Sequence, residues 1–151
     1  MKIVLLSILT VLSVGCQSYH DTYGTIVTEP TIQEHLNTYM LEKFRATGDN
    51  FVYYDIKFEL AYLPGNEIGT CHMAASKKQQ RIISIDTSFW FQASDLAREQ
   101  LIMHEMGHCD LDKHGHDTDG IMRPTQLGDS YYETWRFQLL RDLFEKSEEI
   151  I

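Results

Sequence analysis

Residues 104–114 of the chain read HEMGHCDLDKH. On an α-helix, His104 and His108 would lie about 40° apart around the axis and about 6 Å apart along it, so both imidazoles can reach one metal ion. Glu105 lies too far round the helix to be a third ligand, but it is well placed to touch a water held by the metal. This spacing indicates the helix of a zinc hydrolase, where the metal makes a water acidic enough to attack a carbonyl near neutral pH.

The residues around the two histidines favour a helix with an inward face. Ala97, Leu101 and Leu111 continue, at helical spacing, the stripe that carries His104 and His108. Imidazoles on such a face need partners, because buried polar groups without a hydrogen bond or a ligand destabilise a fold. Two histidines and a glutamate at this spacing also occur by chance, so the interpretation rests on this stripe and on the residues C-terminal to the helix.

A third histidine and a methionine-containing turn come after this helix. His114 lies ten residues beyond the first histidine, and residues 121–124 read IMRP. With the preceding residues they resemble the long zinc-binding motif and the methionine turn of the metzincin metallopeptidases, closest to the matrixin form. The resemblance covers residues 95–124 and implies one catalytic zinc ion, with Glu105 as general base and acid and Met122 as the hydrophobic floor. It implies three metal ligands: His104, His108 and His114.

One position departs from the family. Where the family has a glycine in the left-handed conformation, this chain has Leu111, for which that conformation is costly. The turn after the helix is therefore expected to differ, and His116 and Asp117 are close enough to replace His114 as the third ligand. Glu133 is a further alternative, as in the gluzincin metallopeptidases.

The beginning of the chain has the features of an export signal. Lys2 precedes an apolar run over residues 3–14 that is too short to span a membrane, and Cys16 comes shortly after. Residues 12–16 resemble a bacterial lipobox, which implies that Cys16 is acylated and becomes the mature N-terminus. Ordinary secretion with a nearby cut and an uncleaved anchor are the alternatives. We assign residues 1–15 to a signal peptide, 16–28 to a polar tether and 29–151 to one metallopeptidase domain.

Charge limits the range of partners. The formal net charge is -9, with acidic residues spread along the chain and no basic cluster. Nucleic acid is not expected as a partner, because phosphate binding needs clustered lysine and arginine. The expected partner is a peptide or protein substrate, with membrane contact only through the N-terminal lipid. We expect a monomer that is anchored in the cell envelope as a lipoprotein or secreted.

Two cysteines remain if Cys16 carries a lipid. In an oxidising compartment such a pair often forms a disulfide. Cys109 projects about 100° away from the preceding ligand, toward whatever the helix packs on, and Cys71 lies in a predicted strand. A bridge between them would pin the helix to the sheet; two buried free thiols are the alternative.

Hydrophobic periodicity predicts the other elements. A backing helix, three strands and a closing helix are expected over residues 29–48, 51–63, 68–75, 81–86 and 131–148. Phe44 of the first helix and Trp135 of the last belong to the predicted inward stripes. This order fits an α+β fold with a small three-stranded mixed sheet, and the resemblance implies a reduced metzincin-like (zincin) domain.

Two segments bear on substrate binding. The resemblance implies that an edge strand before the zinc helix pairs with an extended peptide, and Ile82–Ile85 is the segment we expect to do so. Thr87–Gln92 is expected to be an aromatic loop that lines a pocket or plugs the core. The predicted function is that of a zinc-dependent endopeptidase. A gluzincin-like hydrolase using Glu133 and a non-catalytic zinc-binding lipoprotein are the alternatives.

Overall fold

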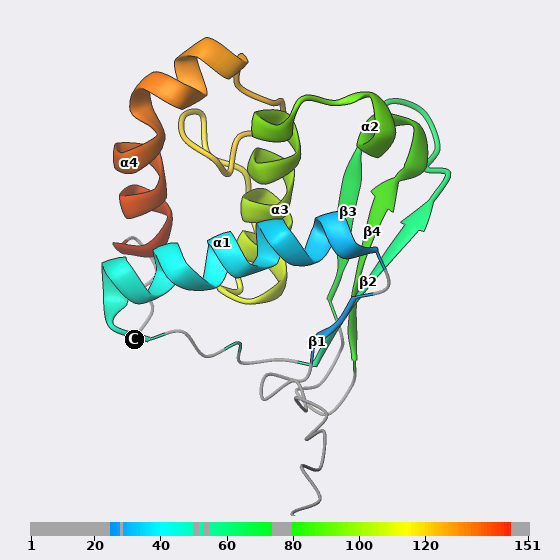
Figure 1. The fold of residues 1–151 in the computed structure, drawn as a ribbon, viewed down its shortest axis with the longest axis horizontal. Coiled ribbons are helices and arrows are strands. Elements are labelled where there is room, and N and C mark those ends of the chain that lie inside the picture. The colour runs from blue at the N-terminus through cyan, green and yellow to red at the C-terminus, as the bar shows by residue number, and fades with distance from the viewer. Residues whose placement is uncertain (1–24, 28, 50–51, 53–54, 74–79, 146–151) are drawn as a thin grey trace, which may run out of the picture.

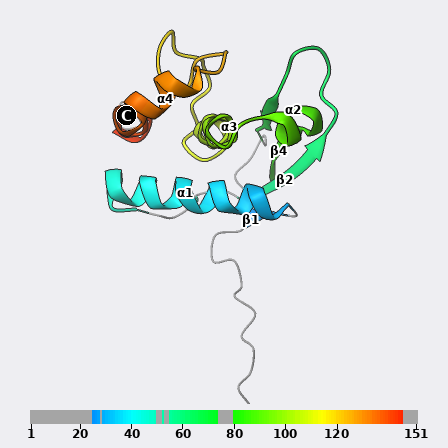
Figure 2. The same cartoon turned by 45° about the horizontal axis from the view of Figure 1, so that its top comes forward.

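An α+β arrangement places three long helices beside a small sheet (Figures 1 and 2). The computed structural model describes residues 25–145 apart from 28, 50–51, 53–54 and 74–79, so the predicted signal peptide, Cys16 and most of the tether lie outside the described residues. None of the helices within these ranges has the length and apolar character that a membrane span requires. The strands are β1 (Thr25–Ile26), β2 (Ile56–Ala61), β3 (Gly69–His72) and β4 (Arg81–Asp86). The helices are α1 (Pro30–Thr47), α2 (Thr87–Gln92), α3 (Asp95–Cys109) and α4 (Asp129–Glu145).

The sheet is mixed and has the strand order β1-β2-β4-β3. β1, β2 and β4 run parallel, and β3 runs antiparallel to β4. The three predicted strands are present, and Thr25–Ile26, which the sequence-based division places in the tether, adds a short fourth strand beside β2. Two residues are too few to show a strand periodicity.

The prediction of an edge strand at Ile82–Ile85 is wrong. This segment belongs to β4, which pairs with β2 on one side and with β3 on the other. The side chains explain the difference, because Ile83 and Ile85 are fully buried as in a central strand, whereas β3 is only four residues long and none of its residues is fully buried. Short, partly exposed strands are typical of sheet edges. β3 is therefore an edge strand that lies beside α3 and pairs with β4 alone among the described strands, and we refer to its other side as its free edge.

Local capping sets the helix boundaries. α1 begins with Pro30 behind the Glu29 cap and ends at Gly48, whose left-handed φ of 77° lets its N–H donate to Phe44 O at 2.8 Å. α3 begins after Ser94, whose hydroxyl accepts from Ala97 N at 3.1 Å. The boundaries of α1 agree with the sequence-based prediction.

The aromatic segment Thr87–Gln92 is a short helix, not the expected loop. Asp86 caps it by accepting from Phe89 N at 2.8 Å, which converts the end of β4 into a helical turn. Trp90 in this turn is fully buried, donates through Nε1 to Thr31 Oγ1 at 3.0 Å and so plugs the core. Phe91 points outward, with 61% of its surface exposed.

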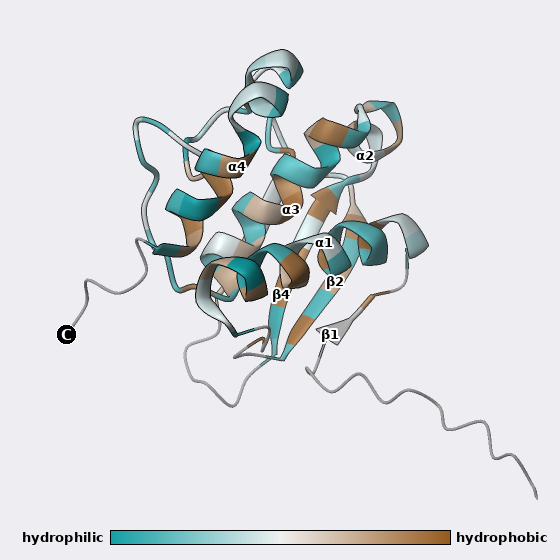
Figure 3. Cartoon of the chain, turned by 60° about the vertical axis from the view of Figure 1, so that its left-hand side comes forward, coloured by the Kyte–Doolittle hydropathy of each residue, from teal (hydrophilic) through white to brown (hydrophobic). Residues whose placement is uncertain are grey.

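The core lies where α1, α3 and α4 meet and where α3 meets the sheet (Figures 1 and 2). Hydrophobic and hydrophilic residues alternate along β2, so one face of the strand packs inward (Figure 3). Phe44 and Trp135 are both 52% exposed, contrary to the prediction. Among the described residues, no helix or strand covers either side chain enough to bury it. The largest buried side chains are Trp90, Tyr39, Tyr132, Phe58 and Phe144.

Candidate metal centre

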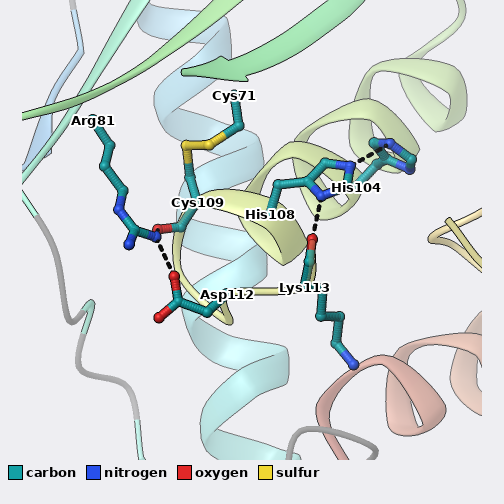
Figure 4. The surroundings of a disulfide bond; sticks show 7 residues. All are labelled: Cys71, Arg81, His104, His108, Cys109, Asp112 and Lys113. Atoms are coloured by element: carbon teal, nitrogen blue, oxygen red, sulfur yellow. Dashed lines mark hydrogen bonds and ion pairs between the residues drawn. A yellow bond between two sulfur atoms is a disulfide. The ribbon is translucent and has the colours of Figure 1, made fainter. Parts of the chain in front are cut away.

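His104 and His108 both lie on α3, one turn apart, as the i, i+4 spacing predicts. Their Nε2 atoms face each other at 3.2 Å, and their ring centroids are 4.8 Å apart. Figure 4 shows the two rings directed toward one another beside the last turn of the helix. Both residues are partly buried, so the pair lies at the floor of a depression rather than on an open surface.

Backbone carbonyl groups hold the two rings in one orientation. Nδ1 of His104 lies 2.7 Å from Ile121 O, and Nδ1 of His108 contacts Lys113 O (Figure 4). A carbonyl oxygen can only accept a hydrogen bond, so each Nδ1 carries the proton and each Nε2 carries a lone pair. Burial also lowers the pKa of His104 to about 4 and lowers that of His108, which keeps both rings neutral. Neutral imidazoles with a fixed tautomer are the form that binds metal ions.

The third histidine of the cluster is His116, where the metzincin resemblance implies His114. One ring nitrogen from each of His104, His108 and His116 lies within 4.8 Å of the other two. The His116 ring stacks on His104 with centroids 5.2 Å apart and meets His108 edge-on at 5.1 Å. His114 is exposed and is not a member of this group, although it lines the same depression.

The turn after α3 explains this shift along the chain. The residue with positive φ is Asp112, at 54°, and not Leu111. Asp tolerates the left-handed region much better than Leu does, and Arg81 Nη1 holds the Asp112 carboxylate at 2.7 Å. The reversal of the chain therefore lies at Asp112, one position beyond Leu111. His116, one of the alternatives left open by Leu111, then reaches the other two histidines.

Met122 lies beneath the helix turn between the two α3 histidines. It is 3% exposed, and its sulfur is so close to Gly107 that a β-carbon at that position would collide with it. Gly107 is therefore the residue of α3 that lets the loop approach the helix axis. Asp117 N donates to Met122 O at 3.0 Å, which ties the segment of His116 to this turn.

Glu105 is buried against β3. It is 3% exposed, and its Oε2 is buried without a hydrogen-bond partner among the described residues. A β-carbon on Gly69 of β3 would lie 2.6 Å from Glu105 Oε1, so only glycine leaves room for this carboxyl group. Burial raises the pKa of Glu105 to about 8. Gly69 is a residue that sequence reasoning missed, because its role depends on a contact across 36 positions of sequence that no local pattern records.

The donor set fits a small tetrahedral metal ion. Two nitrogen ligands at about 2.0–2.1 Å from such an ion lie about 3.3 Å apart, and the Nε2 atoms of His104 and His108 are 3.2 Å apart. Without a cation between them, two lone pairs at this distance repel each other. His116 is the exposed member, so a rotation of its side chain can close the larger gap. The cluster could therefore hold a metal ion.

Three contacts anchor the C-terminal end of α3 to the sheet and loop. Cys71 of β3 and Cys109 form a disulfide with a Cα–Cα distance of 5.7 Å, the pairing predicted as one of two alternatives. Arg81 of β4 donates to Cys109 O at 2.8 Å and pairs with Asp112 (Figure 4). The residue after His108 is thus joined to two strands, which fixes the histidine relative to the sheet.

A buried ion pair anchors the same end of α3 to α1. Asp110 is 2% exposed and accepts from Lys43 Nζ and from Tyr39 Oη, both at 2.7 Å. A buried charge is tolerated only when it is paired and hydrogen-bonded, and this one has both partners. No sequence pattern predicted this contact, because Asp110 lies about 70 positions along the chain from the other two residues.

Two hollows adjoin the histidines. The larger, of about 570 Å³, lies between the free edge of β3 and the loop, and its lining includes Glu105, His108, His114 and His116. The smaller, of about 50 Å³, borders His104 and Glu105 on the other side. Glu105 contributes to both. The aromatic segment Thr87–Gln92 lines neither hollow, and Glu133 is exposed on α4 and does not belong to the histidine cluster.

Comparison with known proteins adds no relative to this description. No protein-family model matches the chain, and no curated protein or solved structure matches it. The function is therefore inferred from the residues of the site.

Proposed function

We propose that this protein is a zinc-dependent endopeptidase of metzincin-like architecture, with His104, His108 and His116 as metal ligands and Glu105 as general base. The observation that carries the proposal is the pairing of two kinds of unsatisfied group at one place: imidazole nitrogens with facing lone pairs, and a buried carboxyl oxygen without a partner among the described residues. A purely structural metal site uses four protein ligands and has no need for such a carboxyl group. An open coordination position beside a general base is the arrangement of a hydrolase.

Each residue of the site would have a defined role. Zinc, when bound, supplies positive charge that polarises a carbonyl and lowers the pKa of water to about 7. The positive charge of a bound cation would favour the ionised form of Glu105, which would accept the proton of the attacking water and then donate it to the leaving amine nitrogen. Ile121 O and Lys113 O would keep His104 and His108 in the ligating tautomer, as outer partners of metal ligands do. Met122 would support the turn from below.

The free edge of β3 is the part of the sheet that we propose for the substrate backbone. An edge strand presents unpaired N–H and C=O groups, and an extended peptide can add to it as a further strand. Gly69, Thr70 and Cys71 line the larger hollow together with Glu105 and His108. A peptide paired with β3 would therefore pass the histidine cluster, which moves this role from the expected segment Ile82–Ile85 to β3.

The disulfide supports a location outside the cytoplasm. Cys71–Cys109 is an ordered link between the sheet and α3, and such bonds persist in oxidising compartments. We propose that the domain is exported and held to the envelope through a lipid on Cys16, with residues up to the first strand as a tether. A palmitate-labelling experiment on wild-type protein and Cys16→Ala checks this part separately.

Replacing Glu105 with glutamine tests the catalytic role. Glu105→Gln keeps the size of the side chain and removes the proton-accepting group, so we expect zinc to stay bound and hydrolysis of a casein or mixed peptide substrate to fall by roughly 10²–10⁴-fold. Glu133→Gln is the matched control, since it changes an exposed glutamate of α4. That control should retain both zinc and activity.

The same measurements separate the alternatives. Retained hydrolysis in Glu105→Gln would show that this residue is not the base. Stoichiometric zinc without any hydrolysis by the wild type would favour a non-catalytic zinc-binding domain. Loss of zinc in Glu133→Gln would favour the gluzincin-like ligand set, which is otherwise unsupported because Glu133 lies outside the cluster.

A further inference from the structure

Arg123, directly after Met122, differs from the other arginines of the described chain. Its Nε, like that of Arg81, is buried without a hydrogen-bond partner among the described residues, but unlike Arg81 it takes part in none of the ion pairs found there. A guanidinium group presents five N–H donors and is always charged, so an arginine without an acceptor beside a cavity is unusual. The remaining described arginines, each with an ion pair or a hydrogen bond, are Arg45, Arg81, Arg98, Arg136 and Arg141.

Arg123 forms part of the wall of the smaller hollow beside the metal site. Its volume of about 50 Å³ is room for roughly four water-sized groups, which suits a short side chain and excludes a large aromatic one. Much of the remaining wall is apolar, with Ile68, Leu101, Ile121 and Leu127 as contributors. An ion pair formed in such surroundings is stronger than one in water.

The wall that carries Arg123 is fixed to α3. Gln100 donates to Leu127 O at 3.3 Å and accepts from Leu127 N at 3.0 Å, and Gln126 donates to Ala97 O at 2.8 Å. These bonds hold Gln126 and Leu127, in the segment that follows Arg123, against the helix that bears His104 and Glu105. A rigid wall favours binding, since little conformational entropy is lost when a ligand enters.

The cationic side chain of Arg123 has no anionic partner among the described residues that line the smaller hollow. Among the described residues that line it, Glu105 is the only acidic one, and no described ion pair joins it to Arg123. The proposed function assigns Glu105 to proton transfer. A carboxylate supplied by the substrate would complement the guanidinium, because the two planar groups form paired N–H···O bonds.

We infer that Arg123 is a specificity-determining residue which binds a substrate carboxylate in the smaller hollow, next to the bond that is cleaved. This inference rests on the proposed peptidase function and names its substrate class: peptides with an acidic residue flanking the scissile bond, or with a terminal carboxylate there. The size of the hollow favours aspartate over glutamate.

The first experiment compares cleavage of defined peptides by the zinc-loaded protein. A mixed peptide library with cut sites read by mass spectrometry identifies the flanking positions, and synthetic peptides then carry Asp, Asn, Leu or Lys there with amidated ends. A second set places a free C-terminal carboxylate at the same distance, which distinguishes the two sources of the anion. We expect kcat/KM for the preferred carboxylate to exceed that of its amide by roughly 10- to 100-fold.

Arginine variants show whether position 123 is responsible. Arg123→Gln should remove the preference, and Arg123→Glu should shift it toward Lys, a gain that misfolding cannot produce. Arg141→Gln is the matched control, because Arg141 is an exposed arginine of α4 that lines neither hollow. It should keep the wild-type preference.

Binding to the Glu105→Gln protein separates failure of this inference from failure of the proposed function. Fluorescence anisotropy with labelled Asp and Asn peptides should give a tighter Kd for the Asp peptide, and the difference should vanish when Arg123→Gln is added. Hydrolysis without a carboxylate preference would overturn the inference and leave the peptidase proposal intact. Arg123-dependent binding without any hydrolysis by the wild type would support carboxylate binding and overturn the peptidase proposal. If neither hydrolysis nor Arg123-dependent binding is found, both proposals are overturned.

Discussion

Two groups of buried polar atoms at α3 differ in whether they have hydrogen-bond partners. At its C-terminal end, the Asp110 carboxylate and the Cys109 carbonyl are buried, and both accept hydrogen bonds from charged or hydroxyl partners. Over the preceding turn and a half of the helix, the Nε2 atoms of His104 and His108 oppose each other, and Glu105 Oε2 has no partner among the described residues. Unsatisfied buried groups destabilise a fold. The contrast indicates that one set of polar residues holds the helix in place, whereas the other is kept ready for a ligand.

Removing Asp110, whose carboxylate has both an ion-pair and a hydrogen-bond partner, should give the largest change in stability. Asp110→Ala leaves Lys43 buried without its carboxylate, and we expect the free energy of unfolding to fall by about 3–5 kcal/mol. Urea denaturation measures this. Glu133→Ala, at an exposed position, should stay within about 0.5 kcal/mol of wild type. A loss below about 1 kcal/mol in Asp110→Ala would mean that the pair does not anchor the helix.

Removing the disulfide should have the next largest effect. Cys71→Ala combined with Cys109→Ala opens a link between residues 38 positions apart, and we expect a loss of about 2–4 kcal/mol, largely by freeing the unfolded chain. Thermal unfolding with and without reductant provides the comparison. The wild type under reducing conditions should approach the double variant, and identical curves for all samples would contradict the assignment.

Metal affinity tests whether the histidine cluster binds an ion. His116→Ala should weaken zinc binding by more than about 100-fold, because even residues that only support a ligand contribute about 10- to 100-fold. His114→Ala should have a far smaller effect, since His114 is outside the cluster. Competition with a chelating dye measures both. The reverse result would restore the ligand set implied by the metzincin motif and would show that the loop rearranges on binding.

Replacing Glu105 with an apolar residue tests whether its buried carboxyl group destabilises the metal-free protein. Glu105→Leu replaces the buried carboxyl group that lacks a described partner with an apolar side chain of similar size, and we expect the metal-free protein to gain about 1–2 kcal/mol in stability while hydrolysis is lost. Urea denaturation of the metal-free variant measures the gain. A clear loss of stability would imply that Glu105 is structurally satisfied in solution.

The smallest expected effect concerns the N-terminal end of α3. His35 of α1 lies 3.4 Å from Asp95, and burial lowers the pKa of His35 below 6.5 despite the neighbouring carboxylates of Asp95 and Glu99. Below about pH 6.5 the unfolded chain takes up a proton that the folded His35 resists. The stabilising contribution of neutral His35 is therefore fully present above that pH, and it is lost as the pH falls through the lower pKa of the folded state.

The variant His35→Gln isolates this contribution. Compared with wild type in the same metal state, its stability should fall less steeply between about pH 6.5 and 5, with a difference of at most about 1.4 kcal/mol per pH unit. His104 and His108 titrate in both proteins, so the difference between them reports His35 alone. Parallel pH curves would show that His35 does not contribute.

Much of the architecture was predictable from local patterns. Hydrophobic periodicity located α1, α3, α4 and the three longer strands, because each element must bury one face. The capping residue Gly48 marked the end of α1, since it satisfies a backbone carbonyl group four residues earlier. Asp86 was overlooked as a cap, and this is why Thr87–Gln92 was expected to be a loop.

The chemistry of the site was predictable where it depends on helix geometry alone. The i, i+4 spacing places His104 and His108 together in any helix, and Glu105 follows from the same geometry. The third histidine of the cluster is different, because it lies on the loop after α3, where Asp112 has a positive φ. Leu111 signalled that this turn would change, but it could not show that Asp112 would take the left-handed conformation with Arg81 as its partner.

Local sequence therefore specified which α3 side chains form the candidate site, because helix and strand periods repeat over a few residues. The order of strands, the edge position of β3 and the approach of His116 to the other two histidines came from packing between distant segments. β4 is central because it pairs with β2 on one edge and with β3 on the other, and Gly69 and Gly107 matter because side chains of other elements lie close to them. Such contacts join residues far apart in the chain, and their energies depend on three-dimensional neighbours that no local pattern contains.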